Sequence, residues 1–312
     1  MKTNIDFYGN RNKIFMVSLF IIAIGLIFNF FFGTRLDMKF TGGATIKYSY
    51  SGEIDTTKID KIAENLTGKS ASVELNAGLD SKENKSLSLA FAGTSTLPID
   101  QQQGLTSALL QEYPDGNFSI IESNSIDPSM GQSFFLKCIL CVLITIAILI
   151  VYIAFRFKKI GGFSAGVMAI IALLHDLLII YFTFIIFKMP LNDNFIAVVL
   201  TILGYSLNDT IVIYDRIREN RKSMAPNTAL HEVVNLSINQ TLGRSIMTSA
   251  TTFAAITVVF VVGLIYNLPS ITTFALPMMV GVFFGCYSSI FIAGPLYAMW
   301  KERKPKAALQ EK

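Results

Sequence analysis

The sequence is poor in the residues on which soluble proteins and most enzymes depend. Only 15% of its 312 residues are charged, against about a quarter in typical soluble domains, and it has two histidines. At the same time 52% of the residues are hydrophobic. A soluble monomer cannot hide that much apolar surface, because such proteins rarely expose large apolar patches. The composition therefore predicts a chain embedded in a membrane.

Cysteine is also scarce, with three residues that all fall in apolar runs: Cys138, Cys141 and Cys286. The first two have C-x-x-C spacing, but no second pair and no histidine cluster accompanies them, so we interpret all three as small buried hydrophobic side chains. The sequence also lacks a nucleotide-binding loop, a His-Glu zinc motif and a nucleophile beside a base. It therefore predicts no enzyme, cofactor, metal or nucleic-acid partner, and energy must come from an ion gradient or from a partner protein.

Six apolar runs are present, each near the length of about 20 residues that a helix needs to cross the hydrocarbon core. They cover residues 14–33, 134–155, 163–187, 194–214, 246–266 and 271–299. The first follows basic residues, as a signal peptide would, but it is long for a signal core and no small-x-small cleavage site follows it. We predict a polytopic α-helical membrane protein with six transmembrane helices.

Basic residues gather in alternate loops. They precede the first run, separate the second from the third and the fourth from the fifth, and follow the sixth: Lys2, Arg11, Lys13, Arg156, Lys158, Lys159, Arg216, Arg218, Arg221, Lys222, Arg244, Lys301, Arg303, Lys304 and Lys306. The short loops on the other side carry only Lys188, beside Asp193, and no charge around Asn267. The positive-inside rule places both termini, residues 1–13 and the basic tail 300–312, in the cytoplasm.

The longest polar segment, residues 34–133, separates the first two runs and is expected to form a domain outside the cytoplasm. Alternating residues Ile46, Tyr48 and Tyr50 predict a half-buried strand, and an apolar face before Gly68 predicts a helix that stops there. Two strands at 73–75 and 87–91 flank the turn-rich stretch 76–85, and a helix at 105–109 and a strand at 118–120 follow.

This order, β-α-β-β-α-β, is that of the ferredoxin-like fold. The domain has no cysteine and no histidine, so it offers no catalytic or disulfide chemistry. We expect it to contact a polypeptide or a partner protein through exposed apolar residues, with a passive spacer as the alternative.

Two acidic residues lie inside the apolar runs, where an aspartate costs about 2.5–3.5 kcal/mol on insertion scales and marks a functional candidate. Asp209 lies about fifteen residues into the fourth run, and Asp176, beside His175, lies about as far into the third. Each is therefore expected near the middle of the membrane. The alternative is a structural aspartate that holds the bundle together through a neighbouring serine or threonine.

Small and hydroxylated residues surround Asp209 and also line the start of the fifth run, around Arg244. Such residues allow helices to approach closely and can line a hydrated path. We predict a polar seam between the fourth and fifth spans, with Asp209 facing Arg244 or a water-filled path. A carboxyl group there can bind and release protons according to which side of the membrane has access. Arg244 can alternatively extend to the interface, as long cationic side chains do.

Four stretches resemble motifs of the SecF family, in that family's order: FTGG at 40–43, LGYSLNDTIVIYDRIREN at 203–220, NQTLGRSIMTS at 239–249 and GCYSSIFIA at 285–293. The long run around Asp209 is the most specific of them. The resemblance implies a subunit that works with the related six-span SecD, is similar to RND exporters and assists the SecYEG channel in the bacterial inner membrane. It further implies that proton flow through the paired bundle moves the outer domains and promotes translocation of the preprotein.

The resemblance also assigns residues. It identifies Asp209 as the family's intramembrane acid and Arg244 as its fifth-span arginine. The ion-translocation candidates are thus Asp209, Arg244, Asn208, Ser206 and Asp176, and the structural motif residues are Gly42, Gly43, Gly204, Asp215, Arg216, Gln240 and Ser288. Two departures occur: Lys39 stands where the family usually has an acid, and Cys286 stands where a small hydroxylated residue is common. The alternative functions are an RND-like half-transporter for a small molecule and a structural membrane scaffold.

Overall fold

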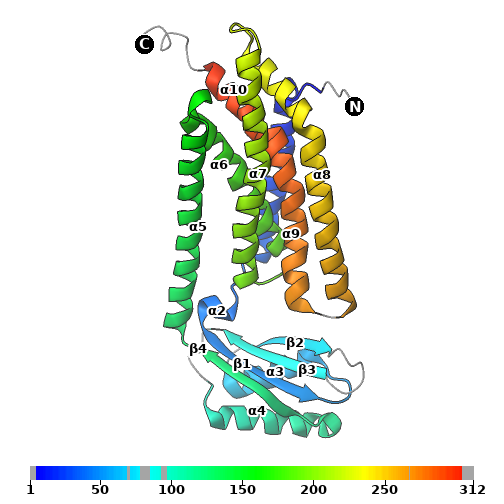
Figure 1. Ribbon diagram of the computed structural model, residues 1–312. Helices are drawn as coiled ribbons and strands as arrows, with labels where there is room; N and C mark the ends of the chain where they lie inside the picture. The colour runs from blue at the N-terminus through cyan, green and yellow to red at the C-terminus, as the bar shows by residue number, and fades with distance from the viewer. Residues whose placement is uncertain (1–4, 69–70, 78–84, 93–96, 267, 304–312) are drawn as a thin grey trace.

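The computed structural model describes residues 5–68, 71–77, 85–92, 97–266 and 268–303. A bundle of long helices stands above a small α+β domain, and the start of α1 and the end of α10 lie at the end of the bundle away from that domain (Figure 1). The centre of the predicted turn-rich stretch, residues 78–84, lies outside the described residues, as do Asn267 and positions 304–312 of the basic tail.

The described residues contain six helices long and apolar enough to cross a membrane, which confirms the six predicted spans. They are α1 (Arg11–Phe32), α5 (Pro128–Arg156), α6 (Gly162–Ile186), α7 (Asp193–Ser223), α8 (Leu230–Ile265) and α9 (Pro269–Ser288), which a π-helical turn η3 (Ser289–Ala293) joins to α10 (Gly294–Arg303). A short 3-10 turn, η2 (Lys158–Ile160), connects α5 to α6. Helices α7 and α8 extend beyond the predicted limits of 214 and 246, because charged residues end an apolar run without ending a helix.

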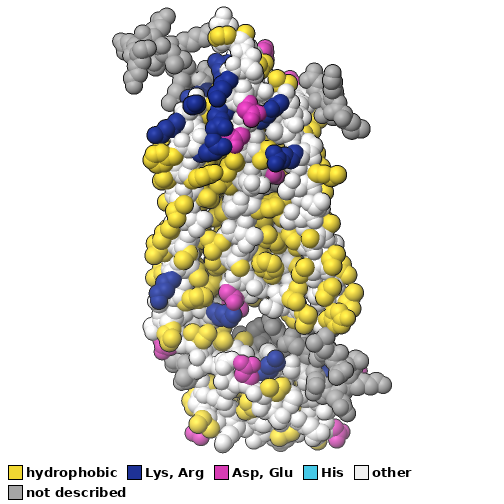
Figure 2. Space-filling view, viewed as in Figure 1, with side chains coloured by type: hydrophobic (Ala, Val, Ile, Leu, Met, Phe, Trp, Pro, Cys, Tyr) yellow, Lys and Arg dark blue, Asp and Glu magenta, His cyan; other side chains and the backbone are white. Residues whose placement is uncertain are grey.

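Three of these helices form the interior of the bundle. In α6, α7 and the α9–α10 helix more than half of the apolar stretch is buried, against 11% or less in α1, α5 and α8. The buried face of α6 begins with small residues, Ser164, Ala165 and Gly166, which let neighbouring helices approach closely. The hydrophobic side chains of α1, α5 and α8 therefore face outward, and yellow side chains cover the middle of the bundle in Figure 2.

The α+β domain follows the predicted order of elements. It consists of β1 (Gly43–Tyr50), α3 (Thr56–Thr67), β2 (Ser72–Ala77), β3 (Lys85–Ala92), α4 (Ile99–Glu112), a 3-10 turn η1 (Pro114–Gly116) and β4 (Ser119–Ile126). The strands form one sheet in the order β2-β3-β1-β4, and every neighbouring pair is antiparallel. Helix α3 ends where the sequence predicts, since Gly68 adopts a left-handed conformation with φ of 69°.

One face of this sheet packs on the two helices to form a separate core. Ile46, Tyr48 and Leu89 of the strands are fully buried together with Ile59 of α3 and Leu105 of α4. The last strand is an exposed edge, and its Ile120 is 42% exposed, whereas Phe118 lies just before the strand and is buried. The domain core shares no buried residue with the core of the bundle.

The junction between the two regions contains a helix that the sequence did not predict, α2 (Met38–Thr41). It ends at Gly42, whose φ of 75° and close contact with the backbone of Pro128 leave no space for a side chain. A Cβ atom on Gly131 of α5 would lie 2.6 Å from the Gly42 nitrogen. The glycine pair at 42–43 therefore allows the start of α5 to pack directly against the chain that enters β1.

Candidate intramembrane polar site

Asp209 lies within the apolar helix α7 and is only 3% exposed. The Ser249 hydroxyl of α8 is 3.5 Å from Asp209 Oδ2, and the Tyr205 hydroxyl donates to Ser249 Oγ at 3.1 Å. Polar side chains of α7 and α8 thus meet around the acid. Asp209 therefore lies between α7 and α8, where the sequence predicts a polar seam.

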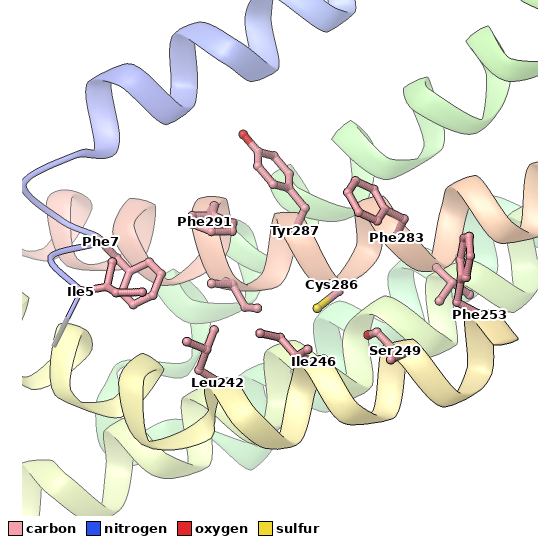
Figure 3. Close-up of a pocket in the computed structure, with 13 residues that line it drawn as sticks. Ile5, Phe7, Leu242, Ile246, Ser249, Phe253, Phe283, Cys286, Tyr287 and Phe291 are labelled. Carbon is pink, nitrogen blue, oxygen red and sulfur yellow. The ribbon is translucent and has the colours of Figure 1, made fainter. Parts of the chain in front are cut away.

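A groove of about 780 Å³ leads to this seam between α8 and α9. Its walls are almost entirely apolar, and Ser249 is one of its few polar groups (Figure 3). The lining residues are Ile5, Phe7, Leu242, Ile246, Ser249, Ala250, Phe253, Val282, Phe283, Cys286, Tyr287, Ile290 and Phe291. Ser249 also contacts Asp209, so only its hydroxyl group separates the groove from the buried acid.

The segment before α1 forms the end of the groove opposite Phe253 (Figure 3). Its backbone at Ile5 both donates to and accepts from the Asn239 side chain of α8, at 3.0 and 2.8 Å, and Asn235 Nδ2 donates to Asp6 at 2.6 Å. The backbone N–H of Gly9, followed by the Asn235 amide, holds the pKa of Asp6 below its ordinary value of 3.8. This segment is therefore attached to α8 by an ionised carboxylate at neutral pH.

Arg244 of α8, the predicted partner of Asp209, is exposed, and so are the candidate Asn208 and the motif residue Gly204 of α7. The described residues form no ion pair between Arg244 and Asp209. Of the two predicted arrangements, a direct pair with Arg244 is thus not the one present. Polar and cationic groups at this depth on an outer surface need a protein partner or water to satisfy them.

Asp176 has a different set of contacts, made through α7 by Ser206, three residues before Asp209. It is completely buried in α6, its Oδ1 lies 3.1 Å from His175 Nδ1, and its Oδ2 accepts hydrogen bonds of 2.7 Å from both Ser206 and Ser288. These contacts join α6, α7 and α9 at one carboxyl group. A Cβ atom on Gly285 would be 3.0 Å from the Ser206 side chain, so this glycine permits the close approach of α9 to α7.

A second layer of hydroxyl groups extends the Asp176 cluster along the same interface. Ser289 donates to the Ser206 carbonyl at 3.0 Å and lies 2.9 Å from the Thr210 hydroxyl. Sequence reasoning missed Ser289 and treated Ser288 as a motif residue only. The signal that could have identified both is a pair of adjacent serines in an apolar span that must pack against an acid.

The remaining motif residues form a network at the end of the bundle that also carries a cluster of Lys and Arg side chains (Figure 2). Asp215 accepts a hydrogen bond from Arg156 of α5 at 3.0 Å and forms an ion pair with Arg218 at 2.9 Å. Arg216 donates to Gln240 at 2.6 Å and pairs with Glu219. These contacts connect α5, α7 and α8 and so stabilise the packing of the bundle.

The cysteines and the described acidic and histidine residues form no metal site. All three cysteines are free, and no group of three or more His, Cys, Asp or Glu side chains in the described part of the chain could hold a metal ion. Cys141 is exposed on α5, so the prediction that it is buried is wrong for the isolated chain. Helix α5 presents most of its surface to the outside, which leaves this small side chain uncovered.

Comparisons with known proteins agree on one family. Residues 106–303 match the family model described as "Protein export membrane protein SecD/SecF, C-terminal". The protein translocase subunit SecF of Borreliella burgdorferi is 32% identical over 299 residues, which cover 95% of this chain and 97% of that protein. The protein translocase subunit SecDF of Bacillus subtilis is also 32% identical, over 96% of this chain and 39% of its own length.

A solved structure has the same architecture. The crystal structure of SecDF from Thermus thermophilus, described as a translocon-associated membrane protein, superimposes with a TM-score of 0.78 at 28% identity. The match covers 96% of this chain and 39% of that one.

Proposed function

This chain belongs to the SecD/SecF family of protein export membrane proteins, and we propose that it acts as the SecF subunit that assists secreted precursors across the membrane. One observation carries this proposal: the similarity to proteins named SecF extends over nearly the whole length of both chains. A family of translocase subunits is not a family of conventional enzymes.

We infer that export is coupled to the proton-motive force through Asp209. A buried carboxyl group at membrane depth, reached through Ser249 and Tyr205, can take up a proton from one side and release it to the other. Each proton that crosses 100 mV supplies about 2.3 kcal/mol, so repeated cycles are needed for one precursor. Ser206, Asn208 and Arg244 are proposed as polar residues that accompany this movement, with Asp176 as a further acid.

The proposed partner in the membrane is SecD. The relative named SecDF is a single chain of which this protein matches 39%, which supports a SecD-like bundle as the neighbour of this one. The exposed Asn208 and Arg244 support this inference, because a neighbouring polar helix bundle would remove them from lipid. The SecYEG channel and the translocating preprotein are the further partners that we propose.

We also propose the orientation that the basic residues predict, with both termini in the cytoplasm and residues 34–133 outside the bacterial inner membrane. The order of strands and helices supports a ferredoxin-like domain at that position. The domain would contact the emerging polypeptide through exposed apolar residues such as Ile99, which is 71% exposed. The groove of about 780 Å³ lies in the bundle, so it gives no support to an outer pocket for small molecules.

The test is Asp209→Asn in cells whose only copy of the gene carries the substitution. We expect export of a secreted precursor to fall to the rate measured without the protein, because an amide keeps the hydrogen bond to Ser249 but cannot carry a proton. The matched control is Asp193→Asn, the same change at the exposed first residue of the same helix, and it should export normally. Normal export by Asp209→Asn, with assembly verified, would make Asp209 structural and favour a scaffold.

A further inference from the structure

We propose that His175 and Asp176 form a second proton-binding centre, held by Ser206, which lies about one turn of α7 before Asp209. The role of this centre in export rests on the proposed function, since it adds a second proton site to the same bundle. Proton binding by Asp176 can be measured whether or not Asp209 carries protons.

The first argument is the burial and geometry of the pair. Asp176 is 0% exposed and His175 is 6% exposed, and their side chains are 3.1 Å apart. An isolated charge in such an interior is strongly unfavourable, so the pair is most stable when it is neutral overall and holds a single exchangeable proton. That proton can reside on His175 with Asp176 ionised as its partner, or on Asp176 with a neutral imidazole.

The second argument is an unsatisfied atom. His175 Nε2 is buried and has no hydrogen-bond partner among the described residues, whereas Nδ1 faces Asp176. Buried polar groups are normally paired, and an exception calls for an explanation. Its ring neighbours are Phe284 and Tyr287, at centroid distances of 6.2 and 6.0 Å. An imidazole that contacts a carboxylate through Nδ1 and has no partner at Nε2 can accept a proton at Nε2 and pass one from Nδ1 to the carboxylate.

The proton transfer can be written so that it balances. In the starting state Asp176 is ionised and His175 is neutral, with its hydrogen on Nδ1 donated to Asp176 Oδ1. A hydronium ion gives its proton to Nε2 and becomes water, the Nδ1–H bond breaks, and that hydrogen bonds to Oδ1. The product is a neutral carboxylic acid and a neutral imidazole with its hydrogen on Nε2, so the net charge of the pair changes from −1 to 0.

This change has a structural consequence at the helix interface. Ser206 of α7 and Ser288 of α9 both donate to Asp176 Oδ2, and hydrogen bonds to an ionised carboxylate are roughly twice as strong as those to a neutral acid. Protonation therefore weakens the contacts that fix α7 and α9 to α6. The π-helical turn that begins at Ser289 directly follows this contact, and such turns occur frequently at functional sites.

The helices packed around the pair carry other ionisable groups. They include Tyr181 of α6, Tyr205 and Asp209 of α7, Cys286 and Tyr287 of α9, and Lys137, Cys138, Cys141 and Tyr152 of α5. Helix α1 contributes only Ser18, hydrogen-bonded to the Tyr287 hydroxyl at 3.0 Å, and carries no ionisable group between Lys13 and its end. The ion pairs of the described residues give Asp176 no partner besides His175. Among the described residues, the side chains that contact Asp176 are therefore His175 and the two hydroxyl donors.

The experiment is infrared difference spectroscopy of the purified full chain in lipid nanodiscs between acidic and alkaline pH. We expect a carbonyl band of a protonated carboxylic acid that changes with pH and is lost in Asp176→Asn but retained in Asp209→Asn. If Asp176→Asn removes no pH-dependent band, Asp176 stays in one protonation state and the proposal is overturned. A separate pH-dependent band that disappears in Asp209→Asn would report Asp209. If no such band exists while Asp176→Asn does remove a band, the coupling role of Asp209 fails and the proposal for His175 and Asp176 stands.

A second variant guards against misfolding of Asp176→Asn. His175→Asn keeps an amide donor near the position of Nδ1 but has no second nitrogen through which to pass a proton. We expect the Asp176 band to develop more slowly after a pH jump in this variant. An unchanged rate would overturn the relay, while Ser206→Ala, which removes one donor and leaves both titrating groups, should keep the rapid response.

Discussion

The two regions of this protein have cores of opposite character. In the α+β domain the buried side chains are apolar, and the hydroxyl of Tyr48 is paired with Thr106 at 3.2 Å. In the bundle the interior also contains Asp176, Asp209, His175 and a series of serines and threonines. All buried Ser, Thr, Asn, His and Asp side chains of the described residues belong to the bundle helices.

This difference indicates which region can change its packing. An apolar core has one close-packed arrangement, and a volume change of even one methylene is felt. Hydroxyl groups that donate to a carboxylate can exchange partners when its charge changes, so helices held by them have alternative arrangements available. We infer that the domain moves as a rigid unit while the rearrangement takes place among α6, α7 and α9.

The largest expected effect tests whether the domain core is independent of the bundle. Leu105→Ala removes a fully buried side chain of α4 and should destabilise the domain by about 2–5 kcal/mol. Limited proteolysis of the full-length protein should then cleave within residues 34–133 faster, while the helical bundle stays intact. Leu110→Ala, on the same helix but 38% exposed, is the control and should leave cleavage nearly unchanged. Loss of the bundle in Leu105→Ala would show that the cores depend on each other.

A smaller effect compares one hydroxyl group from each region. Tyr48→Phe and Thr210→Val each remove a buried hydroxyl with little change of shape, and each should cost about 0.5–1.5 kcal/mol of stability. Only Thr210→Val should also slow precursor export, because Thr210 belongs to the hydroxyl layer beside Ser206 and Asp176. Equal export by the two variants, at matched protein levels, would contradict the inference that the polar interior of the bundle is needed for export.

The sequence was sufficient to predict the elements and the buried acids, for identifiable reasons. Six apolar runs are a strong signal in a membrane protein, and alternation at Ile46, Tyr48 and Tyr50 predicts β1 because one face of the sheet is covered. A glycine after an amphipathic run, Gly68, gives the end of α3. Asp209 was identifiable because a charge in an apolar run has few explanations.

The contacts between helices could not be predicted in the same way. Periodicity shows that a residue lies on a helix face but not which neighbour that face meets, so the hydrogen bond from Ser206 to Asp176 could not be predicted. Arg244 was offered as a partner for Asp209 because both are charged, yet it lies on the exposed side of α8. Helix α2 was missed because a single turn of helix is too short to produce a period.

The smallest expected effect concerns Lys39, which occupies a position where the SecF family usually has an acid. Lys39 pairs with Asp193 at the start of α7 at 2.9 Å, and both side chains are 50% exposed. An exposed pair contributes about 0.2–1 kcal/mol, and we expect a double-mutant cycle of Lys39→Ala and Asp193→Ala, read by thermal unfolding, to give a coupling energy in that range. The coupling should disappear at about 1 M salt, where the screening length is near 3 Å.

The junction itself should survive the loss of this pair. Backbone hydrogen bonds of 2.9 Å from Asp37 to Leu191 and 2.8 Å from Leu191 to Arg35 join the same two segments and do not depend on side-chain charge. The charge reversal Lys39→Glu places two acids together and should be worse than Lys39→Ala, whereas adding Asp193→Lys to it should restore stability. If Lys39→Glu alone leaves the thermal stability unchanged, the positive charge of Lys39 does not stabilise the junction through Asp193, and a lysine at this position has no structural role there.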